Sequence, residues 1–296
     1  MKINKSLPVL VTGATGYIAG WVVKNLLDEG ITVHAPIRDT TNTQKRVHLD
    51  KLAENSSGEI KYFESDLMIE DSYKEAMKGC ELVIHTASPF VMDSKDPQKE
   101  VIEPALKGTQ NVLKTVNETE SVKRVVLTSS IAAIYGNSID GQSVEGGLFN
   151  ESMWNTTSTS TDGEYSYSKT VAEKEAWKIC EEQKRWDLVV INPGFVLGPS
   201  LNPNALFESK KFMLQMGNGD LKSGAPDITM GMVDVRDVSK AHVIAGFSET
   251  AKGRHILSAG THTLLETGGF IKEKFGDKYP VPTRNAPKFL IWILAS

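Results

Sequence analysis

The sequence predicts an α/β protein: a Rossmann-type, doubly wound parallel sheet with a smaller α/β lobe toward the C-terminal side. A glycine-rich turn joins a first apolar run, 9–12, to a helical pattern that begins at 17. Short apolar runs then alternate with helical patterns as far as 191, which is typical of a parallel sheet with helices on both faces. Beyond 201, frequent Pro and Gly interruptions indicate a different, smaller unit.

The expected strands of the large sheet are short apolar runs at 9–12, 32–37, 60–63, 82–85, 124–128 and 188–191. Helical patterns fill the intervals, and the strongest of them spans 165–183. Pro36 cannot donate to a ladder, so it is expected at the carboxyl end of its strand, where the ladder stops. Residues 137–162 are rich in Gly, Ser, Thr and Asn, which predicts a long loop that lines a site.

The glycine turn has the spacing Gly13-x-x-Gly16-x-x-Ala19. Gly13 permits a tight turn, Gly16 permits close approach of a pyrophosphate, and Ala19 permits tight packing of the helix on its strand. Free N–H groups at the helix start, together with the helix dipole, attract phosphates. Glycines also occur at such turns for structural reasons alone, but this position between strand and helix predicts a dinucleotide site.

Arg38 directly follows the second expected strand. An acidic residue about 20 residues beyond the glycines would bind a ribose 2′-hydroxyl, whereas an arginine there suits a 2′-phosphate. Arg38, with Lys45 as a second cation, therefore predicts NADPH/NADP, with NADH as a weaker cofactor. The alternative is an ordinary solvated charge, and the neighbouring Asp39 leaves that alternative open.

The composition excludes several classes of partner. The 296 residues include 40% hydrophobic and 24% charged residues, which is typical of soluble globular proteins. The net charge of −4 gives no reason to expect nucleic acid, and no apolar run is long enough to span a membrane. Cys80 and Cys180 have no metal-ligand spacing, so we expect no metal and a cytoplasmic protein with reduced cysteines. A monomer or a homodimer is expected.

Three side chains suggest acid–base chemistry. Tyr165 and Lys169 lie four residues apart and therefore on one helical face. An ammonium near a phenol lowers the pKa of that phenol from its usual value of about 10. Ser130 ends the fifth strand, where its hydroxyl can reach a substrate carbonyl. Each feature alone has a structural explanation, a surface pair or a turn serine, but the combination with the glycine turn indicates catalysis. Tyr167 is the competing tyrosine, and it points elsewhere on the helix.

Six stretches spread over nearly the whole chain resemble extended short-chain dehydrogenases/reductases of the NAD-dependent epimerase/dehydratase superfamily. They are 12–19, 85–90, 126–133, 165–169, 191–199 and 233–238. Within that group the chain is similar to dihydroflavonol 4-reductases, cinnamoyl-CoA reductases and microbial aldehyde or methylglyoxal reductases. Pro36 departs from the residue usual at its position, and Ala19 replaces a frequent glycine.

The resemblance implies an NADPH-dependent carbonyl reductase with the catalytic triad Ser130, Tyr165 and Lys169. Tyr165 would donate a proton, Ser130 would orient the carbonyl, and Lys169 would hold the ribose. The residues implied to contact the cofactor are Gly13, Thr15, Gly16, Tyr17, Ile18, Arg38, Lys45, Asp66, Leu67, Thr86, Ala87, Ser88, Thr128, Tyr165, Lys169, Pro193, Gly194, Phe195 and Val196.

The expected walls of the substrate pocket are apolar or aromatic. They are Phe90, Ile131, Met153, Trp154, Phe195, Leu197 and Met213, chosen for their place beside the cofactor motifs. The matched motifs aim no Arg or Lys inward, so the expected small-molecule substrate is an uncharged, apolar or aromatic aldehyde or ketone. Ordinary core packing explains several of these residues equally well.

We expect residues 1–192 to form the NADP-binding domain with the triad, and 193–296 to form most of the substrate lobe. Residues 232–247 are expected to return to the Rossmann domain, while a strand at 255–258 is expected in the lobe. The apolar run 289–294 stops within about two helical turns. That run predicts a chain truncated at its C-terminus, with an under-covered apolar patch near Trp292.

Two other functions remain open. The same fold and triad would serve a nucleotide-sugar epimerase or dehydratase with retained NAD⁺. Arg38 and the aromatic loop 88–90 argue against it. A non-catalytic NADP(H)-sensing regulator would need the glycine turn but would have no use for Ser130 together with Tyr165 and Lys169.

Overall fold

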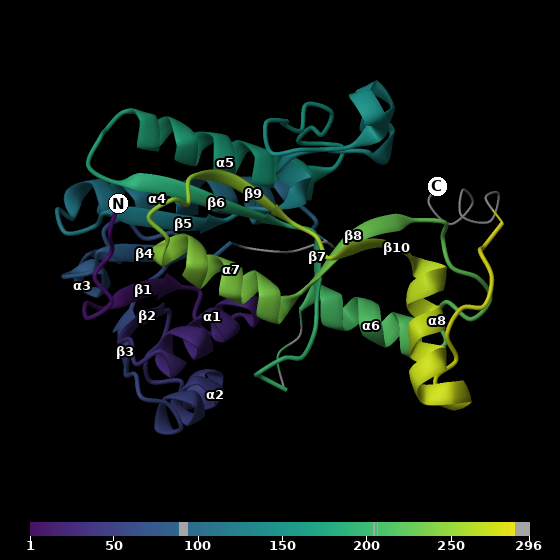
Figure 1. Ribbon diagram of the computed structural model, residues 1–296, viewed down its shortest axis with the longest axis horizontal. Coiled ribbons are helices and arrows are strands. Elements are labelled where there is room, and N and C mark those ends of the chain that lie inside the picture. Colours follow the sequence, from purple (N-terminus) through teal and green to yellow (C-terminus); the bar gives the residue numbers. More distant parts are fainter. Residues whose placement is uncertain (89–93, 204, 206, 288–296) are drawn as a thin grey trace.

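The large sheet is the centre of the molecule (Figure 1). The computed structural model describes residues 1–88, 94–203, 205 and 207–287. Seven strands lie in the order β3-β2-β1-β4-β5-β6-β9, and each neighbouring pair is parallel. They are β1 (Val9–Thr12), β2 (Val33–Ile37), β3 (Ile60–Glu64), β4 (Leu82–His85), β5 (Arg124–Thr128), β6 (Asp187–Pro193) and β9 (Gly253–Leu257). The first six strands follow the Rossmann order, which confirms the predicted fold class.

Helices cover both faces of this sheet (Figure 1). One face packs against α1 (Tyr17–Asp28), α2 (Thr43–Glu54) and α7 (Val235–Phe247), and the other against α3 (Lys74–Met77), α4 (Glu103–Glu118) and α5 (Glu164–Glu181). Side chains alternate between the faces: Val9 and Val11 join the first core, while Leu10 joins the second. Because both faces of the inner strands are buried, β1 and β4 are nearly continuous apolar runs, whereas β3 and β9 at the edges are only partly buried.

Pro36 lies inside β2, where it has no backbone N–H to donate. The sheet needs no donor at this position. The N–H of Val33 donates to Glu59 on the β3 side, so every second N–H after it faces β3 and those between face β1. The ring nitrogen of Pro36 therefore faces β1, and the pairing of β2 with β1 ends at His34. The ladder with β3 continues to Ile37. The expectation that a ladder stops at Pro36 is thus confirmed on the β1 side alone.

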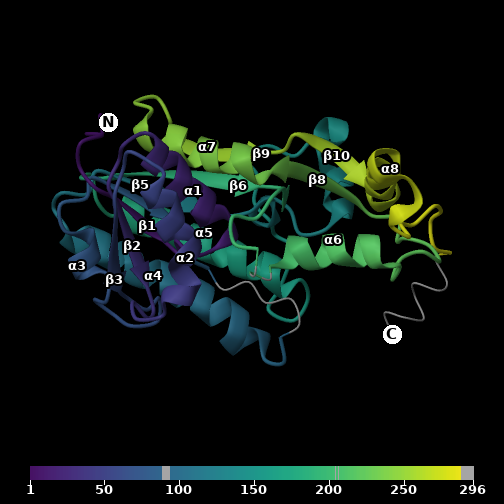
Figure 2. The same cartoon turned by 90° about the horizontal axis from the view of Figure 1, so that it is seen from below.

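A smaller three-stranded sheet, in the order β10-β8-β7, extends from the carboxyl end of the large sheet (Figure 2). Its elements are β7 (Phe195–Leu197), α6 (Glu208–Asn218), β8 (Thr229–Asp234), β10 (Gly260–Thr263) and α8 (Leu264–Phe275). The strand expected in this lobe at 255–258 is instead part of β9, which pairs with β6 in the large sheet. The segment expected to return to the Rossmann domain, 232–247, is divided between the two parts. Its helix, α7, packs against α1 on the large sheet, whereas Met232–Asp234 belongs to β8 of the smaller sheet.

The expected long loop at 137–162 is confirmed, with short 3-10 turns at Ser138–Ser143 and Glu145–Gly147. Asn155 is buried at its base and donates from Nδ2 to the Ala132 carbonyl at 2.9 Å. This bond ties the loop to the segment that follows β5. The apolar run 289–294, with Trp292, lies outside the described residues.

An ion pair between the buried Arg124 and the partly exposed Asp187 holds the opposite, amino end of β5 and β6. The Arg124 guanidinium has almost no exposed surface and donates to the Asp187 carboxylate at 2.7 and 2.8 Å. Its remaining N–H groups donate to backbone carbonyls in the last turn of α7 and just after it, including those of Ala245 and Ser248. The strands are parallel, so this pair lies a full strand length from the carboxyl edge.

Candidate active site

The turn from β1 to α1 is shaped to receive an anion. Gly13 has φ of +67°, a backbone conformation that favours glycine. Helix α1 begins after Gly16, and among the described residues no side chain caps its first N–H groups and no acidic residue occupies its first turn. Free donors at the positive end of a helix dipole fit the pyrophosphate of a dinucleotide.

The ends of β1 and β4 are joined directly behind this turn. Thr12 Oγ1 accepts hydrogen bonds from the N–H groups of Thr86 and Ala87, at 3.1 and 3.0 Å. Thr86 Oγ1 in turn donates to the Thr12 carbonyl at 2.5 Å. A Cβ on Gly13 would lie only 3.1 Å from Ala87 Cα. The glycine therefore allows two of the predicted cofactor segments to touch.

Arg38 and Lys45 are both exposed beyond the end of β2. The neighbouring Asp39 carboxylate accepts from the hydroxyl and the N–H of Thr41, at 2.6 and 2.9 Å. These bonds hold Asp39 inside its own turn and lower the pKa of its carboxyl, as does the nearby charge of Lys45.

Asp66 and Leu67 follow β3 at the same edge of the sheet. Arg38 and Asp66 act in opposite directions on the pKa of the Tyr73 phenol, so both side chains lie around that ring. The Leu67 side chain packs against Gly108 of α4, where an added Cβ would lie 2.5 Å from it. Asn111 Nδ2 donates to the Leu67 carbonyl at 3.0 Å. Helix α4 thus holds this segment in place.

The structure brings Ser130, Tyr165 and Lys169 together. Ser130 is buried after β5, and its hydroxyl lies close enough to Tyr165 to act on the pKa of that phenol. Ser130 Oγ also accepts from the N–H of Ala132 at 3.1 Å, which orients the hydroxyl. Lys169 follows Tyr165 by one turn of α5, and its Nζ lies 5.7 Å from the centre of the Tyr165 ring. A carbonyl oxygen placed between two such hydroxyls would receive two hydrogen bonds.

The expected lowering of the Tyr165 pKa is wrong. Burial raises the pKa of Tyr165 to about 12, while the hydrogen bond with Ser130 acts in the opposite direction. Lys169 is itself buried, and loss of hydration lowers its pKa to about 8, with Glu173 acting to raise it. Tyr165 is therefore a neutral phenol at neutral pH, the form that can donate a proton.

A small cavity lies next to the triad, on the inner side of Lys169. The space open to the centre of a water molecule is about 10 Å³, which suits about one water. Its lining residues are His85, Ala87, Ser88, Thr109, Leu127, Thr128, Ser129, Lys169, Ala172 and Glu173. Burial and the nearby Lys169 charge lower the pKa of His85 to about 3, so this imidazole is neutral. His85 Nδ1 lies 2.8 Å from Thr12 Oγ1.

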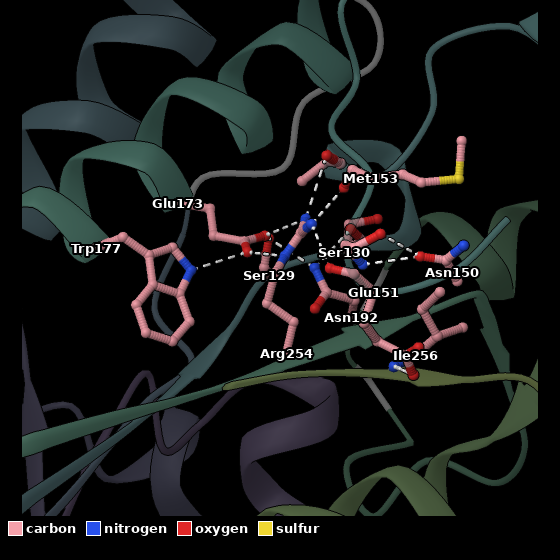
Figure 3. A network of polar contacts seen from close by, with 12 residues as sticks. Ser129, Ser130, Asn150, Glu151, Met153, Glu173, Trp177, Asn192, Arg254 and Ile256 are labelled. Carbon is pink, nitrogen blue, oxygen red and sulfur yellow. Dashed lines mark hydrogen bonds and ion pairs between the residues drawn. The ribbon is translucent and has the colours of Figure 1, made fainter. Parts of the chain in front are cut away.

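A buried carboxylate organises this region, and the sequence analysis did not identify it (Figure 3). Glu173 Oε1 accepts from Arg254 Nε at 2.6 Å and from Trp177 Nε1 at 3.3 Å. Its Oε2 accepts from Ser129 Oγ at 2.5 Å and from Asn192 Nδ2 at 2.8 Å. A signal was present in the sequence, since Glu173 falls between Ala172 and Ala176 on the apolar side of the predicted helix.

Arg254 connects this carboxylate with the segment at 151–154. Its Nη1 donates to the carbonyls of Glu151, at 3.0 Å, and Met153. The guanidinium lies 3.8 Å from the centre of the Trp154 ring. Two of the predicted substrate residues are therefore fixed by the same side chain that pairs with Glu173.

The other predicted wall residues come from several elements. Ile131 begins the turn after β5, while Phe195 and Leu197 lie on β7 and Met213 on α6; all four are partly buried. The Phe195 ring packs edge-on against Phe212 of α6, with centroids 5.0 Å apart. Phe90 lies outside the described residues.

The segment 193–196 is packed closely against the smaller sheet. A Cβ on Gly194 would lie 2.4 Å from the Gly231 carbonyl oxygen, and the N–H of Gly194 donates to the Leu257 carbonyl at 2.9 Å. Close approach of β8 explains this glycine without any ligand. Pro193 ends β6, and Phe195 and Val196 continue into β7.

Tyr17 anchors the segment that begins at 198 next to the glycine turn. Its hydroxyl donates to the Gly198 carbonyl at 2.9 Å, and its ring stacks on Phe207 with centroids 4.0 Å apart. A small pocket near this contact is lined by Thr15, Gly16, Tyr17, His48, Ser200, Leu201, Asn202 and Ala205. Ile18 instead packs into the core beneath α1.

The described residues contain no group of three or more His, Cys, Asp and Glu side chains arranged to hold a metal ion. None of the helices among them combines the length and the apolar character needed to cross a membrane.

Comparison with known proteins identifies relatives of this chain. The NAD dependent epimerase/dehydratase family matches residues 9–257. Cinnamoyl-CoA reductase CAD2 of Medicago truncatula is 42% identical over 252 residues, which cover 84% of this chain and 75% of the relative. An anthocyanidin reductase of Vitis vinifera is 36% identical over 284 residues, 92% of this chain and 82% of the relative.

The fold also matches solved structures. Gre2 of Candida albicans, in complex with NADPH, is 31% identical and superimposes with a TM-score of 0.79, covering 95% of this chain and 86% of that chain. The expected resemblance is thereby confirmed, and the chain is an oxidoreductase of this group. The chain belongs to the NAD dependent epimerase/dehydratase family, as an extended short-chain dehydrogenase/reductase of the dihydroflavonol 4-reductase, cinnamoyl-CoA reductase and aldehyde reductase branch.

Proposed function

We propose that this protein is an NADPH-dependent carbonyl reductase that acts on an uncharged, apolar or aromatic aldehyde or ketone. The observation that carries the proposal is that Ser130 and Tyr165 meet, with Lys169 one turn away, at the same sheet edge as the glycine turn. The relatives named as reductases, and the NADPH complex of Gre2, support it. In this proposal residues 1–192 hold the cofactor and the triad, and most of 193–296 serves the substrate.

The chain offers a partner for each charged part of NADPH. The first N–H groups of α1 would hold the pyrophosphate, because they are uncapped. Arg38 and Lys45, both exposed, would hold the 2′-phosphate. Lys169 would hold the nicotinamide ribose, and Thr86, Ala87 and Ser88 would border it. When bound, NADPH supplies the hydride.

Tyr165 would then supply the proton. Its raised pKa keeps the phenol protonated at neutral pH, so the O–H is available to the carbonyl oxygen. Ser130 would donate a second hydrogen bond to the same oxygen, since its hydroxyl is already fixed by the Ala132 N–H. The Lys169 ammonium would stabilise the phenolate that remains after transfer.

The substrate preference is tested by the rate of NADPH consumption. A mostly apolar pocket, with Tyr165 and Ser130 as its convergent polar groups, should favour larger apolar carbonyls. Each buried methylene contributes roughly 0.8 kcal/mol, so benzaldehyde-type and branched aliphatic aldehydes should exceed acetaldehyde in kcat/KM by about tenfold or more. A clear preference for phosphorylated, carboxylated or CoA-linked carbonyls would contradict the assignment of an uncharged substrate.

The proton donor is tested by Tyr165→Phe, with Tyr167→Phe as the matched control. Loss of a general acid costs roughly 10²–10⁴ in rate, so Tyr165→Phe should reduce kcat by at least about 100-fold. NADPH binding, followed by its fluorescence, should persist in both variants. Near-normal turnover in Tyr165→Phe together with an inactive Tyr167→Phe would assign the role to Tyr167.

The cofactor preference is tested by Arg38→Ala. A hydrogen bond to a charged group contributes roughly 1.5–3 kcal/mol, so the Kd for NADPH should rise about 10- to 100-fold. The Kd for NADH should change little, because NADH lacks the 2′-phosphate. An equal loss of affinity for both cofactors would show that Arg38 does not recognise the phosphate.

A further inference from the structure

Glu173 follows Lys169 by one helical turn, and both side chains line the small cavity next to the triad. We propose that Glu173 is the positioning residue that keeps Lys169 positively charged, and that Arg254 balances Glu173 while fixing the segment 151–154. The role of Lys169 in this inference rests on the proposed function. The electrostatic interaction among Glu173, Lys169 and Arg254 does not depend on the proposed function.

Glu173 can hold a negative charge although its side chain has no exposed surface. Four donors surround its two oxygens: Arg254, Trp177, Ser129 and Asn192. The Arg254 guanidinium, 2.6 Å away, and the three other donors offset the solvation that this carboxylate loses on burial.

Among the residues that the structure describes, few other charges face Lys169. The titratable groups around it are Tyr165 and Glu173 on its own helix, His85 at the end of β4 and, beyond Glu173, Arg254 of β9. The cavity side chains from α4 and β5 are the neutral Thr109, Leu127, Thr128 and Ser129. His85 is neutral because its pKa is about 3. Glu173 is thus the one anion among these groups, and it raises the pKa of Lys169 against the effect of burial.

Arg254 has a second set of contacts that reach away from the cavity. It donates to the backbone carbonyls of Glu151, Met153 and, at 3.3 Å, Ala133. Asn192 extends the network in another direction, because its Nδ2 also donates to the Ser130 carbonyl at 3.1 Å. One ion pair therefore connects the helix of Lys169, the backbone of Ser130 and the segment expected to contact substrate (Figure 3).

The test is the pH dependence of NADPH affinity, measured by fluorescence without any substrate. Affinity should be full while Lys169 is protonated and should fall as pH rises through its pKa, about 8. The midpoint is the pH at which half of this change in NADPH affinity has occurred. Glu173→Gln removes the anion and leaves the positive charge of Arg254 near Lys169, so the midpoint should move to lower pH by about one unit. Arg254→Met removes the positive charge that offsets the effect of Glu173 on Lys169, so the midpoint should move to higher pH.

Two control variants separate charge from packing. Arg254→Lys keeps the charge but loses the fork of hydrogen bonds. Its midpoint should match that of the wild type, while KM for a carbonyl substrate rises. Asp187→Asn breaks the ion pair with the buried Arg124 at the opposite end of the sheet. It should lower Tm and leave the midpoint unchanged.

Midpoints that stay at the wild-type value in Glu173→Gln and Arg254→Met, or that move in the same direction, would overturn the inference. If Glu173→Gln does not fold, the arginine variants decide. An upward shift in Arg254→Met with none in Arg254→Lys supports the inference, and any other pair of results overturns it. Absence of carbonyl reduction by the wild type, with the opposite shifts intact, would instead refute the proposed function alone.

Discussion

Glu173 and Arg254 have almost no exposed side-chain surface, and an ion pair taken out of water loses solvation energy that only well-placed partners offset. Here those partners come from β5, β6, α5 and the segment at 151–153. Each partner therefore has a defined position relative to the others. Removing either member would leave a buried charge uncompensated, so the pair imposes one geometry on the end of the sheet where Ser130 and Tyr165 meet.

The chemistry of the site follows from burial as much as from residue type. Removal from water favours the neutral form of an ionisable group, so it raises the pKa of Tyr165 and lowers that of Lys169. A phenol that keeps its proton is suited to carbonyl reduction, where tyrosine must give a proton, and Glu173 acts against burial to keep the neighbouring Lys169 charged. The parallel sheet adds the second requirement, because it brings the ends of β1, β4 and β5 to one edge.

Short-range spacing made several features predictable. Gly13 and Gly16, the strand-end Ser130, and the Tyr165/Lys169 pair are each visible within a few residues of sequence. The Glu173–Arg254 pair is not, because 81 residues separate its members and the pairing of β6 with β9 joins them. Strands β7 and β10 were missed because they are short and only partly buried. Helix α8 had a recognisable start, since Thr263 and Glu266 form a capping box. The Tyr165 pKa was predicted in the wrong direction because burial is a tertiary property.

A crystal structure of the protein with NADPH and a bound carbonyl inhibitor tests the central claim most directly. The account predicts the nicotinamide ribose within hydrogen-bond distance of Lys169 Nζ. It also predicts the inhibitor oxygen between the hydroxyls of Ser130 and Tyr165, with the carbonyl carbon about 3–3.5 Å from the nicotinamide carbon that supplies the hydride. A nicotinamide ring bound away from these three side chains, or an inhibitor oxygen held by other residues, would contradict it.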